Sequence, residues 1–275
     1  MATFNNYGAF AVDSGWGTAG NWSAGVPVDG QEVKVLTNSR TIPGTDHSLV
    51  QLDVMLAAAD FLGALGSIGT PMRIDAAECT LEHGGANLYL DGIIANLYTD
   101  FPSLAATACV INSVNAKTVT AWRHRRGRAT VGAACTLTAM HIIGEPAPGQ
   151  SIVQFVAGCT PTLVEQECGK IIWDGNAGTP TVNVDGGELE QNGGTITACT
   201  LRGTGKIKHG AGTMTTLTMK GGILDITGPL AHAIGTIEYY DGQILQGSYA
   251  DSAIAVNVRA RGRMGWMPGT SLTLH

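Results

Sequence analysis

The sequence predicts an all-β protein whose fold is a parallel β-helix, also called a β-solenoid. Three observations favour this fold: short runs of alternating polar and apolar residues, glycine-containing turns between the runs, and a phrase that recurs along the chain. Of the 275 residues, 38 are glycine, about twice the number expected from average usage. The chain is long enough to bury a sizeable core without disulfides or metals.

Short alternating runs dominate the chain after residue 70. Residues 181–184, 217–219 and 223–226 alternate with the period of two that half-buried strands have. Asp-Gly and Gly-Gly dipeptides lie between such runs, and glycine readily reaches the positive φ that tight corners need. We therefore expect many short strands separated by tight turns.

The recurring phrase contains a cysteine. Ala-Cys-Thr-Leu occupies residues 134–137 and 198–201, and Glu-Cys-Thr-Leu occupies residues 78–81. The series Cys79, Cys109, Cys135, Cys159 and Cys199 is spaced at similar intervals, except that the last interval is clearly the longest. This last interval divides in two if Gly178 takes a cysteine's place, because Thr-Pro-Thr-Val after it echoes Thr-Pro-Thr-Leu after Cys159. Irregular coils of about 20 residues favour a solenoid of roughly ten coils over a β-sandwich.

The cysteines have four candidate roles: disulfides, a metal site, reactive thiols or a repeating structural position. Zinc sites use close pairs such as Cys-x-x-Cys, whereas the closest pair, Cys159 and Cys168, is nine residues apart. Parallel Cβ vectors on neighbouring coils suit the torsion of a disulfide poorly. We therefore expect free thiols, buried as one small inward residue per coil, and we expect no metal and no cofactor.

The bulk properties limit the classes of partner. A net charge of −6 disfavours general nucleic-acid binding, which needs a basic surface. The N-terminal residues lack the basic and apolar regions of a signal peptide, and no apolar run reaches the length of a bilayer span. We expect a protein made in a reducing cytoplasm, with no membrane partner.

Basic residues concentrate in one short stretch. Trp122, Arg123, Arg125, Arg126 and Arg128 lie within seven residues. In a strand, Arg123 and Arg125 would share one face, and Arg126 and Arg128 would share a face after a reversal of direction. On an acidic chain this stretch suits a negatively charged protein surface, with a solvated loop or DNA contact as alternatives.

Two terminal segments flank the predicted solenoid body, which covers residues 16–250. Residues 1–15 carry too little apolar pattern for a coil and are expected to form an N-terminal docking arm. Residues 251–275 are expected to form a strand and a C-terminal arm. This arm carries a second set of candidate partner-binding residues, Arg259, Arg261, Arg263 and Trp266.

The N-terminal segment carries the most specific local pattern. In residues 16–36, WGTAGNWSAGVPVDGQEVKVL, the sequence Asn21-Trp22-Ser23, followed by Gly25, Pro27 and a strand after Asp29-Gly30, resembles the start of many bacterial surface and phage-borne β-solenoids. Because the terminal coil of a β-helix exposes apolar surface, we expect a cap around residues 16–36, with Trp16 and Trp22 covering the open end of the core and ligand stacking as the alternative. Residues 49–97 resemble the rung pattern of bacteriophage virion β-solenoid proteins of the capsid decoration or head-fibre type.

The resemblance implies a structural virion protein of a tailed bacteriophage, without enzymatic activity. Such a protein would be made in the host cytoplasm and would stabilise the head as a capsid decoration or cement protein. The major capsid protein would be its partner, and analogy with fibrous phage proteins implies a homotrimer. One alternative is a glycan-binding tail spike or fibre protein, including a polysaccharide depolymerase; another is a bacterial surface adhesin, which the missing export signal disfavours.

The depolymerase alternative depends on paired carboxylates. Glycoside hydrolysis needs two acids about 5 to 9.5 Å apart across a groove. Alternation places Glu188 and Glu190 on one outward face, near Asp185 in sequence and one or two coils from Asp225. That arrangement fits a catalytic site and a solvated strand, and we expect the solvated strand. The histidines His83, His141, His209 and His232 are expected to point outward or to lie in turns.

Overall fold

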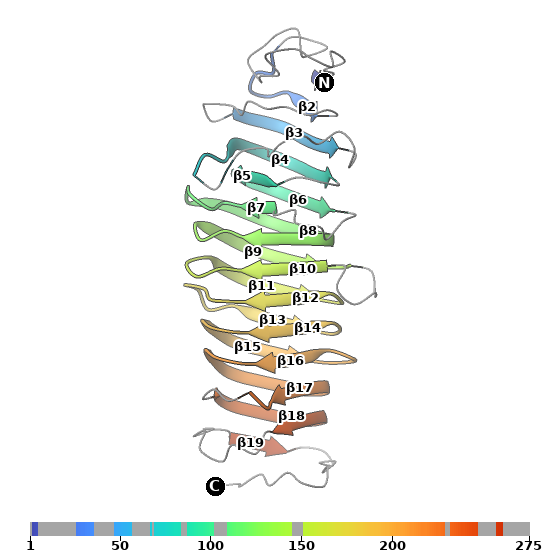
Figure 1. The fold of residues 1–275 in the computed structure, drawn as a ribbon, viewed down its shortest axis with the longest axis vertical. Helices are drawn as coiled ribbons and strands as arrows, with labels where there is room; N and C mark the ends of the chain where they lie inside the picture. Colours follow the sequence, from blue (N-terminus) through green and yellow to red (C-terminus); the bar gives the residue numbers. More distant parts are fainter. Residues whose placement is uncertain are drawn as a thin grey trace. The chain divides into compact units, whose positions relative to one another are not determined.

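The computed structural model describes residues 2–4, 26–35, 47–56, 67, 69–83, 87–101, 109–144, 151–228, 232–246 and 257–260. These residues form nineteen β-strands and no helix, and parallel strands stack as a β-solenoid of about nine turns (Figure 1). The predicted fold class is confirmed. None of the described residues belongs to a helix of the length and apolarity that a membrane span requires. The chain divides into two compact units, Met1–Ala139 and Met140–His275.

The first unit contains eight complete strands and the start of a ninth. They are β1 (Ala2–Phe4), β2 (Glu32–Val35), β3 (His47–Leu56), β4 (Met72–His83), β5 (Leu88–Asp91), β6 (Ile94–Asp100), β7 (Cys109–Ile111), β8 (Lys117–Val131) and β9 (Cys135–Ile142). One parallel series runs β1–β2–β3–β4–β6–β8. A second series runs β4–β5–β7–β8, so β4 and β8 are long enough to take part in both.

The second unit repeats this plan with two strands in each coil. Its remaining strands are β10 (Ser151–Phe155), β11 (Thr160–Gln166), β12 (Lys170–Trp173), β13 (Thr181–Val184), β14 (Glu188–Gln191), β15 (Thr195–Leu201), β16 (Lys206–His209), β17 (Thr213–Ile226), β18 (Ala233–Gln246) and β19 (Asn257–Ala260). One series runs β10–β12–β14–β16–β17–β18, and the other runs β11–β13–β15–β17–β18–β19. The three runs predicted at residues 181–184, 217–219 and 223–226 are all strand.

The coils are most regular in the second unit. Ile152 pairs with Lys170, Lys170 with Glu188, and Glu188 with Lys206, so the step along the chain from one coil to the next is the same each time. Thr236 pairs with Asn257, which is a slightly longer step. The observed coil lengths are therefore close to the spacing predicted from the recurring phrase.

The terminal segments differ partly from expectation. Residues Ala2–Phe4, assigned above to an arm, pair in parallel with β2 and therefore belong to the stack of strands. The strand predicted after Asp29-Gly30 is β2, and Gly30 has the positive φ of 81° expected at this turn. Trp16, Trp22, Arg261, Arg263, Trp266 and most of both predicted arms lie outside the described residues. Arg259 lies in β19, opposite Glu238.

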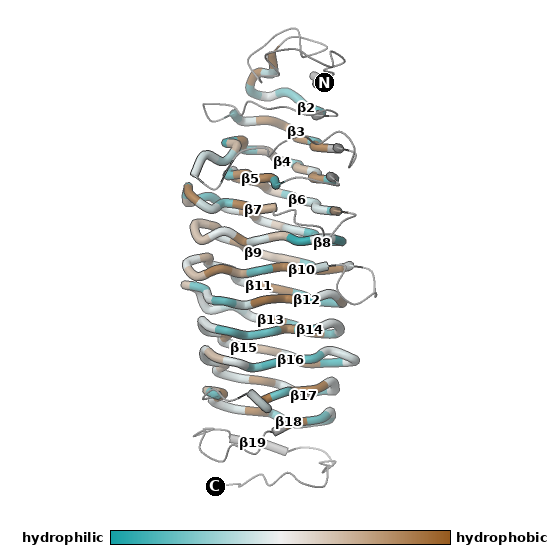
Figure 2. The backbone as a smooth tube through the Cα atoms, in the orientation of Figure 1, coloured by the Kyte–Doolittle hydropathy of each residue, from teal (hydrophilic) through white to brown (hydrophobic). Residues whose placement is uncertain are grey.

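Alternate residues of each strand form the core. In the first unit one inward column stacks Val33, Leu52, Cys79, Leu97 and Trp122, all nearly inaccessible to solvent. In the second unit an equivalent column stacks Val164, Val182, Cys199, Leu217 and Ile237. Figure 2 shows hydrophobic and hydrophilic residues alternating along the strands, with β14 and β16 distinctly hydrophilic. In-register stacking therefore sorts side chains into apolar inward columns and mostly polar outward ones.

The sequence suggested that the regularly spaced cysteines share one inward column, but Cys79 and Cys109 lie in different columns. Cys79 stacks between leucines, whereas Cys109 belongs to the other series, between Leu88 and Ala129. The proposed equivalence of Gly178 with Cys159 is also wrong, because Val164 pairs with Val182 and the required partner was Leu163. The same inward columns hold leucine and tryptophan, so the position does not require a small residue.

The burial of the cysteines is as predicted. All six are free thiols, and Cys79, Cys109, Cys135, Cys159 and Cys199 are buried. Burial raises the pKa of the Cys199 thiol from 9.0 to about 12, and it does the same for Cys159. Cys168 is only half-buried, and its thiol donates to the Gly144 carbonyl at 2.6 Å.

We predict that the five buried cysteines do not react with a thiol reagent at neutral pH in the native protein, because the thiolate is the reactive form. Denaturation should expose all six thiols, so titration before and after unfolding measures the difference. Cys199→Ala should lower the free energy of unfolding by about 1 kcal/mol, since it removes one buried sulfur atom. Rapid native labelling of Cys199 would contradict its placement in the core.

Tight corners between strands depend on glycine at specific positions. Gly187 has φ 75°, and a Cβ atom there would overlap the Gly169 carbonyl oxygen of the preceding coil. Coils can stack this closely only if the corner carries no side chain.

Gly187→Ala should therefore lower the free energy of unfolding by about 2 kcal/mol or more, measured by urea unfolding. Gly69→Ala is the matched control, because no atom lies within 4 Å of the added Cβ and the φ of Gly69 is not in the positive region. Equal stability of the two variants would show that the corner tolerates a side chain.

Candidate protein-binding surface

The arginine-rich stretch lies in β8, in the first unit. A register shift occurs here, because Thr99 pairs with His124 whereas the next residue, Asp100, pairs with Arg126. Arg125 is the extra residue of this bulge, and both Arg125 and Arg126 are partly exposed. The reversal predicted within the stretch is therefore present, and a bulge produces it. We call Arg123, Arg125, Arg126 and Arg128 the arginine surface.

Asp100 holds two of these arginines. Arg126 binds its carboxylate with both Nε–Oδ1 at 2.6 Å and Nη2–Oδ2 at 2.9 Å, and Arg125 Nη1 lies 3.2 Å from Oδ2. Burial alone would raise the pKa of the Asp100 carboxyl, but hydrogen bonds and charge from Arg126 and Arg125 hold it below its usual value. The carboxylate is almost fully buried, so it fixes both guanidinium groups in place.

The other two arginines are exposed. In the described part of the chain, no ion pair involves Arg123 or Arg128. Arg123 stacks on Tyr98 of the preceding coil, which offers no carboxylate. These two side chains carry positive charge that the described residues leave unneutralised.

Trp122 is not part of this surface, which corrects the prediction that it binds a partner. Its side chain is 1% exposed and stacks on Leu97 in the core. The indole Nε1 donates to Thr99 Oγ1 at 2.8 Å. Trp122 alternates with the outward Arg123, and that alternation was the signal for an inward position.

His124 completes a buried polar network with the same threonine. Its Nδ1 lies 2.8 Å from Thr99 Oγ1, and its Nε2 lies 3.2 Å from the Gly127 carbonyl oxygen. A carbonyl only accepts, so the neutral ring carries its hydrogen on Nε2 and accepts the threonine hydroxyl on Nδ1. Burial lowers the pKa of His124 from 6.5 to about 4.

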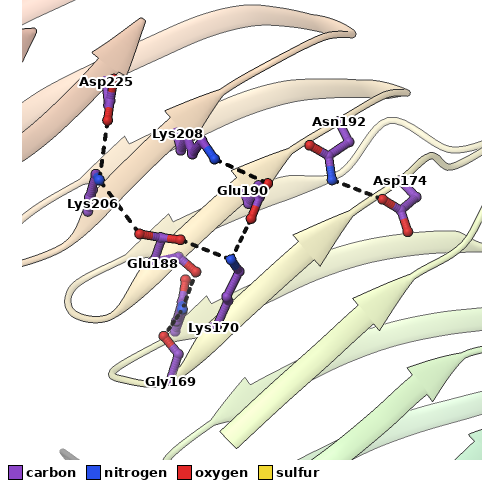
Figure 3. Close-up of polar contacts among 10 residues, drawn as sticks. Gly169, Lys170, Asp174, Glu188, Glu190, Asn192, Lys206, Lys208 and Asp225 are labelled. Carbon is purple, nitrogen blue, oxygen red and sulfur yellow. Dashed lines mark hydrogen bonds and ion pairs between the residues drawn. The ribbon is translucent and has the colours of Figure 1, made fainter. Parts of the chain in front are cut away.

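A second charged surface covers β12, β14, β16 and β17 in the second unit. Three lysines and three acids alternate across the coils (Figure 3): Lys170, Glu188, Glu190, Lys206, Lys208 and Asp225. We call these six residues the charge network. Lys170 Nζ lies 3.2 Å from Glu188 Oε1 and 2.5 Å from Glu190 Oε2. Lys206 links Glu188 to Asp225 at 3.7 and 3.2 Å.

The charge network does not have the electrostatics of a glycosidase site. A general acid needs a raised pKa, whereas a hydrogen bond from Lys170 lowers the pKa of Glu190 below its usual value. Burial would raise the pKa of Asp225, but hydrogen bonds from Thr227 and the charge of Lys206 lower it. Glu188 and Glu190 share an outward face as predicted, although lysines rather than water alone surround them. Asp185 is exposed and pairs with Arg202 at 3.0 Å.

Two histidines expected to point outward or lie in turns are in fact buried. His209 and His232 are 1% and 2% exposed, and their Nδ1 atoms lie 3.0 Å apart. Because His232 Nε2 donates to the Gly228 carbonyl at 3.3 Å, its Nδ1 accepts from His209. This leaves His209 Nε2 buried without a hydrogen-bond partner. Burial, with a contribution from His232, lowers the pKa of His209 from 6.5 to about 4.

The other two of these four histidines, His83 and His141, lie in strands. His141 is half-buried, and its Nε2 lies 2.9 Å from Glu167 Oε1. His83 lies in β4. No group of three or more potential metal ligands occurs among the residues that the structure describes.

His124 and His209, the two buried histidines with a lowered pKa, predict that acid destabilises the protein. His124 and His209 both have their pKa lowered from 6.5 to about 4, so the unfolded chain takes up protons in this window and the folded chain does not. Stability is complete above pH 6.5 and is lost as the pH falls, by up to about 1.4 kcal/mol per pH unit for each histidine.

Urea unfolding between about pH 7 and about pH 5 measures this slope, because most carboxyl groups titrate below this range. His209→Gln should remove the contribution of His209 to this loss of stability, so the dependence of stability on pH should become shallower. A wild-type stability that does not change over this interval would contradict the burial of both rings.

Comparison with protein families, curated proteins and solved structures finds no match to this chain. The resemblance of residues 16–36 and 49–97 to phage virion proteins therefore stays a prediction.

Proposed function

We propose that this chain is a structural virion protein of a tailed bacteriophage, which decorates the capsid and stabilises the head through protein–protein contacts. The observation that carries the proposal is the arginine surface. Arg123 and Arg128 are exposed and have no carboxylate partner among the described residues, although the chain as a whole is acidic. Unpaired, exposed guanidinium groups suit an acidic surface on another protein.

The setting of the arginines favours a rigid contact. β8 pairs with both β6 and β7, so its backbone is fixed on either side of the bulge. Asp100 holds Arg125 and Arg126 before any partner arrives. Arginines fixed in this way lose less conformational entropy on binding, which favours affinity. The acidic partner would be the major capsid protein, as the resemblance implies, and the homotrimer that it also implies stays a prediction.

The tail-spike alternative draws on a different observation. Glu188 and Glu190 lie side by side on an outward face of a parallel β-solenoid, where a glycan would have access. The hydrogen bond from Lys170 lowers the pKa of Glu190 and makes this carboxyl a poor proton donor, so among the spike functions the arrangement favours glycan binding over hydrolysis. Glycan cleavage that Glu190→Gln abolishes would favour the spike over the capsid protein.

The proposal predicts that the arginine surface is needed for attachment to heads. Purified protein should bind heads assembled from the genome that encodes this chain but lacking the chain itself. Arg123→Glu combined with Arg128→Glu should weaken this binding by about tenfold or more, because like charges would then face each other. Co-sedimentation measures the binding, and the melting temperature of the variant should stay close to that of the wild type.

Lys208→Glu is the matched control, because it reverses the charge of an exposed side chain in the charge network. It should leave binding to heads unchanged. The proposal fails if the wild-type protein does not bind heads, or if the double arginine variant binds as tightly as the control.

A further inference from the structure

One inward column of the second unit contains two buried polar side chains that are direct neighbours. Gln191 ends β14 and His209 ends β16, and the two residues pair in register across the parallel strands. Both are almost inaccessible to solvent. Gln191 Nε2 donates to the Thr213 carbonyl at 3.2 Å, and His209 Nδ1 lies 3.0 Å from His232 Nδ1. Gln191 Oε1 and His209 Nε2 have no hydrogen-bond partner in the described part of the chain.

Both unpartnered atoms are hydrogen-bond acceptors. The Thr213 carbonyl only accepts, so the Gln191 amide turns its NH₂ group toward it and its Oε1 away. His209 donates from Nδ1 to His232, because the Nε2 hydrogen of His232 is bound by the Gly228 carbonyl. The neutral His209 ring then carries a lone pair on Nε2. Two acceptors cannot bond to each other, so this pair requires a donor other than these two side chains.

The neighbours in the same column do not supply this donor. Trp173 precedes Gln191 in register, and the single N–H group of its indole donates to Asn176 Oδ1 at 3.2 Å. Ile226 lies beyond His209 in the column, and its side chain is apolar. The two acceptors therefore lie between an indole whose hydrogen is already bound and a hydrocarbon side chain.

We propose that Gln191 Oε1 and His209 Nε2 bind one buried water molecule, which donates one hydrogen to each of them. Register neighbours lie about 4.8 Å apart, and the two acceptors are the same number of bonds from their Cα atoms. A water that donates twice at about 2.8 Å spans two acceptors about 4 to 5 Å apart, so its reach matches the step between coils. Buried waters commonly satisfy polar groups that the chain itself leaves unpaired.

The water completes a chain of hydrogen bonds inside the second unit. The chain runs from the Gly228 carbonyl through His232, His209, the water and Gln191 to the Thr213 carbonyl. It links β14 and β16 to the first residue of β17 and to the turn before β18. The water thus acts as a structural ligand, which holds together coils that no direct side-chain bond joins at this position.

A cation fits this site less well than water. A protonated His209 has an Nε2 hydrogen for Gln191, and an ammonium ion has hydrogens for both acceptors, but either one places positive charge in the core. The acids of β14 and β17 lie on the outward face and bind lysines: Glu188, Glu190 and Asp225. No carboxylate of these strands therefore compensates a charge beside His209, and burial lowers the pKa of this histidine to about 4. A neutral donor avoids the cost of an unpaired buried charge.

The number of long-lived internal waters tests the site. Oxygen-17 magnetic relaxation dispersion of the full chain detects water molecules that stay bound for longer than the protein takes to tumble. Gln191→Met removes one acceptor at a similar side-chain length, and it should lose one such water relative to the wild type. Leu189→Met is the matched control, because it introduces the same residue at another buried position of β14 and leaves both acceptors in place.

Circular dichroism verifies that each variant is folded. A crystal structure of the wild-type chain should show the water within about 3.2 Å of both acceptors, and it tests the site even if Gln191→Met does not fold. Equal water counts in the two variants, or a wild-type crystal structure without the water, would overturn the proposal. The water site does not depend on the capsid role, because it concerns the interior of the isolated chain, whereas binding to heads is a separate measurement.

Discussion

The parallel backbone pairing between successive coils is the constraint on which the rest of this structure depends. Each strand satisfies the N–H and C=O groups of the strand one coil earlier, so residues that are one coil apart in the sequence lie directly against each other. Equivalent side chains are then separated by only about 4.8 Å. Neighbouring side chains within each column must therefore be compatible with one another, in the core and on the surface alike.

The polar columns show two ways of meeting that rule. On the surface, Lys170, Glu188 and Lys206 alternate in sign in one column, and Glu190, Lys208 and Asp225 alternate in another, because identical charges at this spacing would repel. Partly exposed pairs contribute little individually, so the alternation matters more for fixing the register than for stability. Inside, Gln191 bonds the Thr213 carbonyl and His209 bonds His232, yet each retains one unpartnered atom. The burial of these two inward polar side chains is therefore only partly compensated within the chain.

The period of the fold could be read from the sequence more reliably than the position within the period. Recurring phrases predicted the approximate coil length, and alternation predicted the strands at residues 181–184, 217–219 and 223–226. The alignment of Cys159 with Gly178 failed by one residue, because the two similar phrases are spaced one residue further apart than the constant step that the strands keep between these coils. Trp122 and His209 were misplaced although alternation could have shown their faces: Trp122 is next to the outward Arg123, and His209 is two residues from the inward Ile207. Their partners in the preceding coil, Leu97 and Gln191, are buried as well.

The same rule applies to Arg123 and Arg128, whose charges have no carboxylate partner among the described residues. A solenoid can neutralise an outward arginine by placing a carboxylate one coil away, as it does where Asp185 lies against Arg202. Arg123 instead lies against Tyr98, and nearby Asp100 binds Arg125 and Arg126. The chain therefore concentrates four arginines at one bulge, and the single buried carboxylate there binds two of them. An arrangement that served stability alone would not need the exposed pair, since unpaired surface charge adds little to folding. In the function that we propose, this pair would act outside the chain, by attracting an acidic surface.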